Sequence, residues 1–141
     1  MVVLDTDHVS LLEFGASNAS RNLLTRLASL DDDDVFTTVV NYEEQTRGWM
    51  TQISAARTAE QQVTAYAKLR KQLDNFCRFH VLDFDRRAAE QFQDLRQARI
   101  RIGTLDLRIA AIAMTQNATL LSRNLSDFQQ VPRLHVEDWT A

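Results

Sequence analysis

The chain has 141 residues, which suits one domain that buries about 70% of its unfolded surface. A hydrophobic fraction of 45% is ordinary for a globular protein, and a net charge of −3 argues against a general polyanion binder. A single cysteine excludes an internal disulfide, and no apolar stretch approaches the roughly 20 residues that span a bilayer, so we expect a cytoplasmic protein without a membrane partner.

Short apolar strands alternate with helical segments along the chain. The sequence predicts strands at residues 2–6, 35–40, 79–84, 118–122 and 134–139. It predicts helices at residues 8–14, 17–30, 41–50, 55–75, 86–99 and 104–114, with Ser20, Asn41 and Thr104 as N-caps, and a short helical turn at 125–131. The first residues lack the basic flank and cleavage site of a signal peptide, so we expect them to belong to the fold.

The strands are apolar on both faces, which is typical of a parallel sheet covered by helices on both sides. We therefore expect an α/β protein, a three-layer α/β/α fold with a mainly parallel five-stranded sheet. There are few glycines and one proline, so no linker is expected, and residues 1–141 are predicted to form a single domain.

Acidic side chains recur where predicted strands end or helices begin. Asp5 follows the first strand, and Glu44 lies in the first turn after the second strand. Asp106 lies in the first turn of an apolar helix, and Asn124 and Asp127 follow the fourth strand. In a parallel sheet these places share one edge, where ligands of open α/β sheets bind.

Several carboxylates in one crevice repel one another, and a divalent cation removes that conflict. Mg²⁺ or Mn²⁺ prefers oxygen ligands, keeps several waters and binds through a few carboxylates. Simpler interpretations also exist: Asp106 favouring the helix dipole, Glu44 as a surface residue, and Asp7 as the cap of the first helix. The three histidines have no metal-ligand spacing.

Three stretches resemble the PIN-domain ribonucleases, and most closely the VapC-type toxins of bacterial toxin–antitoxin modules. They are VVLDTDHVSLL, TTVVNYEEQTRG and IGTLDLRIAAIAMTQNATLLSRNLSDF with VPRLHVEDW after it. The resemblance implies a five-stranded parallel sheet, Mg²⁺- or Mn²⁺-dependent cleavage of RNA that leaves 5′-phosphate and 3′-hydroxyl ends, an antitoxin partner and a homodimer. Its acidic site is carried over here as Asp5, Glu44 and Asp106, with Asp5 and Asp106 as the main metal ligands.

The chain departs from this family pattern at three positions. Asp7 stands where many members have Asn, and it either adds charge near the site or caps the helix. Asn124 takes the position of a fourth acid, and Asp127 comes one helical turn later, so either one completes the site. Ser122 stands where Thr is usual, and its hydroxyl can still orient a metal ligand.

Two other functions fit parts of the sequence. The stretch DTDHV matches the opening of haloacid-dehalogenase-like phosphatases, in which Asp5 would be a nucleophile. Such a site also needs a lysine near a late strand, whereas both lysines, Lys68 and Lys71, lie on a polar helix. The third class is a non-enzymatic interaction module whose acids only solvate the edge of the sheet.

Six arginines fall between residues 86 and 108, against three acids. Arginine forks bind phosphate, so this stretch either contacts RNA or forms a solvated helix face. Trp49 and Phe14 could stack bases, but the usual burial of aromatic side chains favours packing.

Overall fold

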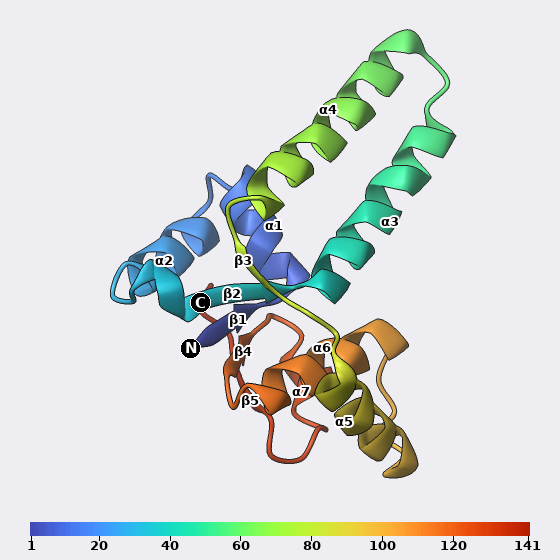
Figure 1. Ribbon diagram of the computed structural model, residues 1–141. Coiled ribbons are helices and arrows are strands. Elements are labelled where there is room, and N and C mark those ends of the chain that lie inside the picture. Colours follow the sequence, from blue (N-terminus) through green and yellow to red (C-terminus); the bar gives the residue numbers. More distant parts are fainter.

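Five short strands form one parallel sheet at the centre of the computed structural model, which describes residues 1–141 (Figure 1). The strands are β1 (Val2–Leu4), β2 (Val35–Thr38), β3 (His80–Leu82), β4 (Thr119–Leu121) and β5 (His135–Glu137). Their order is β3-β2-β1-β4-β5, and every neighbouring pair is parallel. The central position belongs to β1, so the residue that follows it emerges in the middle of one sheet edge.

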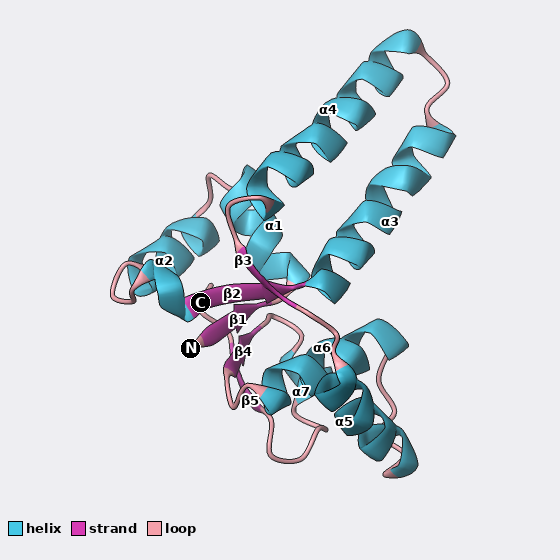
Figure 2. Ribbon diagram, viewed as in Figure 1, coloured by secondary structure: helices cyan, strands magenta, loops and turns pink.

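Helices lie on both sides of this sheet, as Figure 2 shows. They are α1 (Thr6–Phe14), α2 (Asn18–Leu27), α3 (Val39–Ala55), α4 (Ala59–Phe76), α5 (Arg86–Gln97), α6 (Thr104–Thr115) and α7 (Leu125–Phe128), with a 3-10 turn at Asp32–Asp34. None of them is long and apolar enough to cross a membrane. The predicted three-layer α/β/α architecture with a parallel sheet is confirmed.

Side chains that alternate along the central strands separate two apolar clusters. Val3 and Leu120 point into the larger cluster, which includes α5 and α6. Leu4 and Leu121 point into the smaller cluster, which includes α1 and the end of α4. This period of two is the geometry of a strand buried on both faces, and it explains why the strands are continuous apolar runs.

Helix α3 begins two residues before the predicted start. Thr38 is its N-cap and accepts hydrogen bonds from the amides of Val40 and Asn41, while the Asn41 side chain accepts from the amide of Thr38. Val39 and Val40 were predicted as strand because they are β-branched, but the capping box overrides that preference. The other two predicted caps are also wrong, since α2 is capped by Ser17 in place of Ser20 and α6 by Gly103 in place of Thr104.

A long helical hairpin formed by α3 and α4 projects beyond the sheet (Figure 1). The turn between the helices spans residues 56–58, and Thr58 caps α4 through a second capping box. The predicted helices at 41–50 and 55–75 correspond to these two longer elements. The hairpin base carries Asn41 and Glu44 toward the sheet edge, and its far end lies away from that edge.

The two capping boxes allow a matched test of burial. We expect Thr38→Val to lower the free energy of unfolding by about 1–2 kcal/mol, because the lost hydroxyl bonds lie in a buried site. Thr58→Val removes the same cap where water can replace it, and we expect about 0.5–1 kcal/mol. Urea unfolding measures both values, and equal losses would contradict the proposed importance of burial.

Candidate active site

Asp5 lies directly after the central strand and is the N-cap of α1. It is only 6% exposed, and its side chain accepts a hydrogen bond of 2.8 Å from the Thr6 amide. The side-chain amide of Asn41 donates to Oδ1 at 3.0 Å, and the Ser122 hydroxyl donates to Oδ2 at 2.7 Å. Segments that follow three strands, β1, β2 and β4, therefore fix both oxygens of this carboxylate.

Glu44 is linked to Asp5 through Thr6 and Asn41. The Thr6 hydroxyl donates to Glu44 Oε1 at 2.5 Å and accepts from the Asn41 amide at 3.1 Å. Asn41 and Glu44 are three residues apart on α3, so they share one helix face. Asn41 is fully buried, and it joins the cap of α3 to the two carboxylates.

Asp106 and Asp127 form the other half of the acidic site. Asp106 lies in the first turn of α6, and Asp127 lies in α7. The side-chain amide of Asn124 donates to Asp127 Oδ2 at 3.1 Å and lies 3.5 Å from Asp106 Oδ2. The Asn124 nitrogen thus lies between the two acids, and Asp127 supplies the charge at this end of the site.

The acids raise one another's affinity for protons. Burial raises the pKa of Asp5 to about 7, with further contributions from the charges of Asp7 and Asp106, although hydrogen bonds from Ser122 and Thr6 act in the opposite direction. Burial raises the pKa of Asp106 to about 6, together with the charges of Glu44, Asp127 and Asp7. These couplings show that the acids share one electrostatic environment.

No protein cation compensates this charge. None of Asp5, Glu44, Asp106 and Asp127 has a Lys, Arg or His partner within 4.0 Å. No group of three His, Cys, Asp or Glu side chains is arranged to hold an ion directly. The donor set fits a hard cation that keeps part of its water shell and binds through one or two carboxylates.

The family model described as "PIN domain" matches residues 2–134. The chain belongs to the PIN domain family. Among curated PIN relatives, Ribonuclease VapC2 of Rickettsia felis is 35% identical over 66 residues, covering 44% of this chain and 49% of the relative. A tRNA(fMet)-specific endonuclease VapC of Salmonella typhimurium is 33% identical over 66 residues, covering 44% and 50%. These alignments span about half the length of each relative.

The similarity of this PIN domain to solved structures extends over nearly the whole chain. The VapBC2 complex of Rickettsia felis, bound to a promoter DNA fragment, contains a chain that is 26% identical with a TM-score of 0.72, covering 99% of both chains. FitAcB from Neisseria gonorrhoeae has a TM-score of 0.74 at 21% identity, covering 99% of this chain and 98% of the other, and this similarity shows the fold alone.

All four acids that the sequence predicts for the PIN site lie at one sheet edge. Of the two interpretations of Asp7, the helix cap is wrong, because Asp5 caps α1 and the helix starts at Thr6, whereas the charge of Asp7 does act on Asp5 and Asp106. No site role is predicted for Thr6 from the sequence, and Asn41 is predicted only as a helix cap. The signal that would have found Asn41 is its place three residues after Thr38 and three before Glu44.

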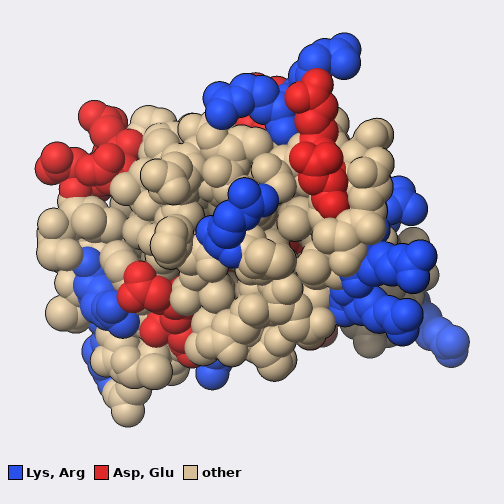
Figure 3. All heavy atoms as spheres, turned by 90° about the horizontal axis from the view of Figure 1, so that it is seen from below, with Lys and Arg blue, Asp and Glu red and all other residues tan.

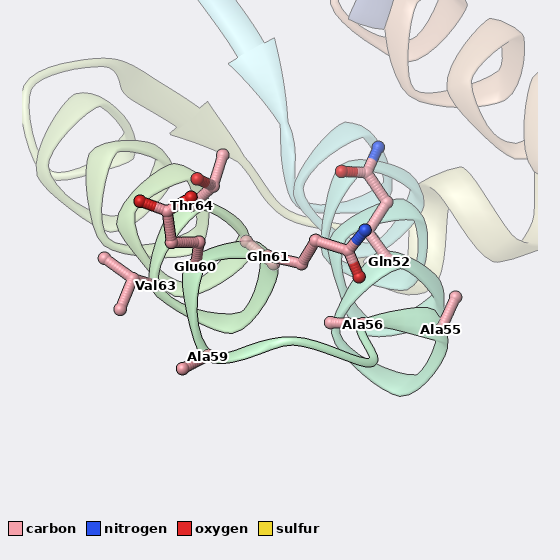
Figure 4. A pocket seen from close by; sticks show the side chains of 9 residues that line it. Gln52, Ala55, Ala56, Ala59, Glu60, Gln61, Val63 and Thr64 are labelled. Carbon is pink, nitrogen blue, oxygen red and sulfur yellow. The ribbon is translucent and has the colours of Figure 1, made fainter.

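A hollow lies away from the acids, at the far end of the α3–α4 hairpin (Figure 4). It has a volume of about 830 Å³ and is lined largely by small side chains.

Trp49 packs edge-on against Phe14, with the ring centroids 5.8 Å apart, and Lys68 and Lys71 lie over the Trp49 and Phe14 rings respectively. These contacts support packing over base stacking for the two aromatic residues.

The raised pKa of Asp5 predicts a pH-dependent stability in chelator. Between about pH 4 and pH 7 the folded protein binds more protons than the unfolded chain, so its stability falls as the pH rises through this window. Asn at position 5 cannot ionise. We therefore expect Asp5→Asn to raise Tm relative to wild type by several degrees more at pH 8 than at pH 4.5, at about 3 °C per kcal/mol.

Thermal unfolding followed by circular dichroism measures this difference. The exposed Asp94→Asn variant, on α5, serves as the control, and its Tm offset from wild type should be the same at both pH values. An Asp5→Asn offset that does not change with pH would contradict the prediction.

Proposed function

We propose that the chain is a metal-dependent endoribonuclease of the VapC type, the toxin of a toxin–antitoxin module, with residues 1–141 as a single nuclease domain. The observation that carries this proposal is the group of four acids at the carboxyl edge of a PIN sheet, with no cation of the protein to compensate them. The names of the curated relatives, a ribonuclease and a tRNA-specific endonuclease, support it.

In this proposal Asp5, Asp106 and Glu44 would hold Mg²⁺ or Mn²⁺, partly through the water shell that the cation keeps. When bound, the metal lowers the pKa of a water and stabilises charge on the attacking and leaving oxygens of an RNA phosphodiester. Ser122 and Asn41 keep the Asp5 carboxylate in one orientation, because each donates to a different oxygen. The Thr6 hydroxyl orients Glu44, whose free oxygen is available to accept the proton of the attacking water.

Asp127 acts on the other side of the site. The side-chain amide of Asn124 lies between Asp127 and Asp106, and the charge of Asp127 contributes to the raised pKa of Asp106. We assign Asp127 the role of the fourth acid, and Asn124 the role of fixing its position relative to Asp106. The first turn of α6 has no side-chain cap, so its free backbone N–H groups form the positive end of the helix dipole beside Asp106. This favours the ionised form of Asp106.

The alternative functions are not favoured. A phosphatase with Asp5 as nucleophile needs a lysine at the sheet edge, but Lys68 and Lys71 lie over Trp49 and Phe14. An inert interaction module has no use for buried acids with raised pKa values, because such groups lower stability unless they serve a site.

Removal of one carboxylate tests the proposed chemistry. We expect Asp106→Asn to lower the rate of RNA cleavage in Mn²⁺ by at least about 100-fold, because even partners of metal ligands contribute about 10- to 100-fold. Cleavage of a fluorescent RNA pool followed on gels measures the rate, and circular dichroism checks the fold. Glu90→Gln, an exposed acid on α5, is the control. Full wild-type cleavage in excess EDTA would refute the metal role.

Six arginines on α5, on α6 and in the turn between them support a phosphate-rich substrate. Arg86, Arg87, Arg96, Arg99, Arg101 and Arg108 form no ion pair within 4.0 Å, although the protein is acidic overall. Figure 3 shows basic side chains gathered at one edge of the face seen from below. Among the six arginines, Arg96 and Arg108 lie over the Phe92 ring, which holds their guanidinium groups together beside α6. We propose that this set contacts the RNA backbone.

The salt dependence of RNA binding tests the arginine contact. In the Asp106→Asn background, which keeps the RNA intact, we expect Arg99→Ala with Arg101→Ala to make the log–log salt slope shallower by about 1.4, because each lost phosphate contact contributes about 0.7. Fluorescence anisotropy at several salt concentrations measures the slope. Arg47→Ala with Arg70→Ala, whose side chains pair with Glu43 and Asp74, is the control. An unchanged slope in the first variant would contradict the contact.

We also propose a protein partner of antitoxin type and a homodimer. The structural relatives are toxin–antitoxin complexes, including VapBC complexes bound to DNA. An antitoxin arginine that reached the acids would form charge-assisted hydrogen bonds and compete with the cation. Large apolar side chains exposed on the hairpin, among them Met50, Val63 and Tyr66, are available for a protein contact.

A further inference from the structure

His8 is fully buried beside the acidic site, yet the proposed metal chemistry does not use it. Its Nδ1 lies 2.6 Å from Oδ1 of Asp7, and the backbone N–H of Trp139 donates to its Nε2 at 3.3 Å. The nearest oxygen of Asp138 is 3.8 Å from Nε2, beyond hydrogen-bond distance. The protein therefore supplies one partner to each ring nitrogen, from two segments that are far apart in the sequence.

The contact with Trp139 defines the tautomer of the ring. A backbone N–H can only donate, so Nε2 must present its lone pair. A neutral imidazole that accepts at Nε2 carries its hydrogen on Nδ1, and this hydrogen then donates to Asp7. His8 thus has a defined direction of hydrogen bonding, from the C-terminal segment toward the active site.

Asp7 receives that hydrogen bond while it also binds the segment after β4. Its Oδ2 accepts from the backbone N–H of Arg123 at 3.0 Å and lies 3.4 Å from the Ser122 hydroxyl. The same hydroxyl donates to Asp5 at 2.7 Å. Both oxygens of Asp7 face protein donors, and these contacts place its carboxylate beside Ser122 and Asp5.

The C-terminal segment holds the Trp139 N–H in place. The amide and hydroxyl of Thr140 both donate to Asp138, at 2.8 and 2.5 Å. The side chain of Asn22, on α2, donates to the Thr140 carbonyl at 3.1 Å. The guanidinium of Arg26 lies 4.6 Å from the centre of the Trp139 ring. A fixed backbone donor at this place is what a defined tautomer of His8 requires.

We propose that His8 is a positioning residue of the acidic site: residues 138–140 set its tautomer, and its Nδ1–H holds Asp7 where Asp7 keeps Ser122 and Asp5 aligned for a divalent cation. The inference rests on the proposed function, because the property that His8 serves is cation binding by Asp5. It assigns a role to the Asp at position 7 and to the last residues of the chain.

The tautomer can be read directly from nitrogen chemical shifts. In protein labelled with ¹⁵N-histidine, kept in chelator at neutral pH, we expect His8 to be a neutral Nδ1–H imidazole. The exposed His80 and His135 are identified by replacing each with Asn. An Nε2–H tautomer or a doubly protonated ring at His8 would overturn the proposal, and this result does not depend on catalytic activity.

Two isosteric variants test the role itself. His8→Asn places an amide donor near the Nδ1 position, and His8→Gln places an amide near the Nε2 position, so only the first can replace the bond to Asp7. We expect Mn²⁺ affinity to stay within about threefold in His8→Asn and to fall by about 10- to 100-fold in His8→Gln, as for other groups that orient metal ligands. Equal affinities in the two variants would overturn the positioning role.

Electron paramagnetic resonance of free Mn²⁺ measures these affinities, and His135→Asn, at the opposite end of the sheet, is the control that should match wild type. Asp106→Asn separates this proposal from the one on which it rests. If Asp106→Asn binds Mn²⁺ as tightly as wild type, the proposed metal site is wrong. If it loses binding while His8→Gln does not, only the role of His8 is wrong.

Discussion

The buried carboxylate of Asp5 at the end of the central strand is the constraint on which the rest of the site depends. A carboxylate that is 6% exposed lowers the stability of the fold unless its oxygens are paired. Here the donors are an amide of the backbone, the side-chain amide of Asn41 and the hydroxyl of Ser122, all of them neutral. They replace the hydrogen bonds of water but leave the negative charge in place. The fold thus supplies the orientation of the carboxylate, and compensation of its charge is left to the cation that we propose for this site.

The same separation explains why helices begin where they do. Asp5 caps α1, and Thr38 caps α3 in a capping box that the Asn41 side chain completes, so both helices begin at residues linked to the acids. Helix starts supply free backbone donors near the sheet edge, where a carboxylate benefits from them. A shift of α3 by one residue would move Asn41 and Glu44 off the face that meets Thr6. Cap formation and site geometry are therefore a single structural event in this part of the chain.

The sequence predicts the sheet and the four acids because both follow from local patterns. Continuous apolar runs indicate strands buried on both faces, and an acid directly after such a run emerges at the carboxyl edge. The start of α3 was missed because Val39 and Val40 favour a strand, whereas the side chains of Thr38 and Asn41 close a capping box around them. The long-range partner of His8 cannot be predicted from the sequence. The Trp139 N–H is 131 residues away, and only the pairing of β4 with β5 brings it to α1.

That long-range contact shows how an acidic site can be rigid without being neutralised. Arg123 is beside the site, but its backbone N–H faces Asp7, and its side chain forms no ion pair with the acids. An ion pair at this place would lower the pKa of the nearby carboxylates and compete with a metal ion for them. Neutral donors avoid that competition, and burial raises the pKa of Asp5 to about 7 even though the hydrogen bonds from Ser122 and Thr6 act in the opposite direction. Six of the arginines that form no ion pair lie on α5, on α6 and in the turn between them, where they can attract a polyanion without occupying the proposed cation site.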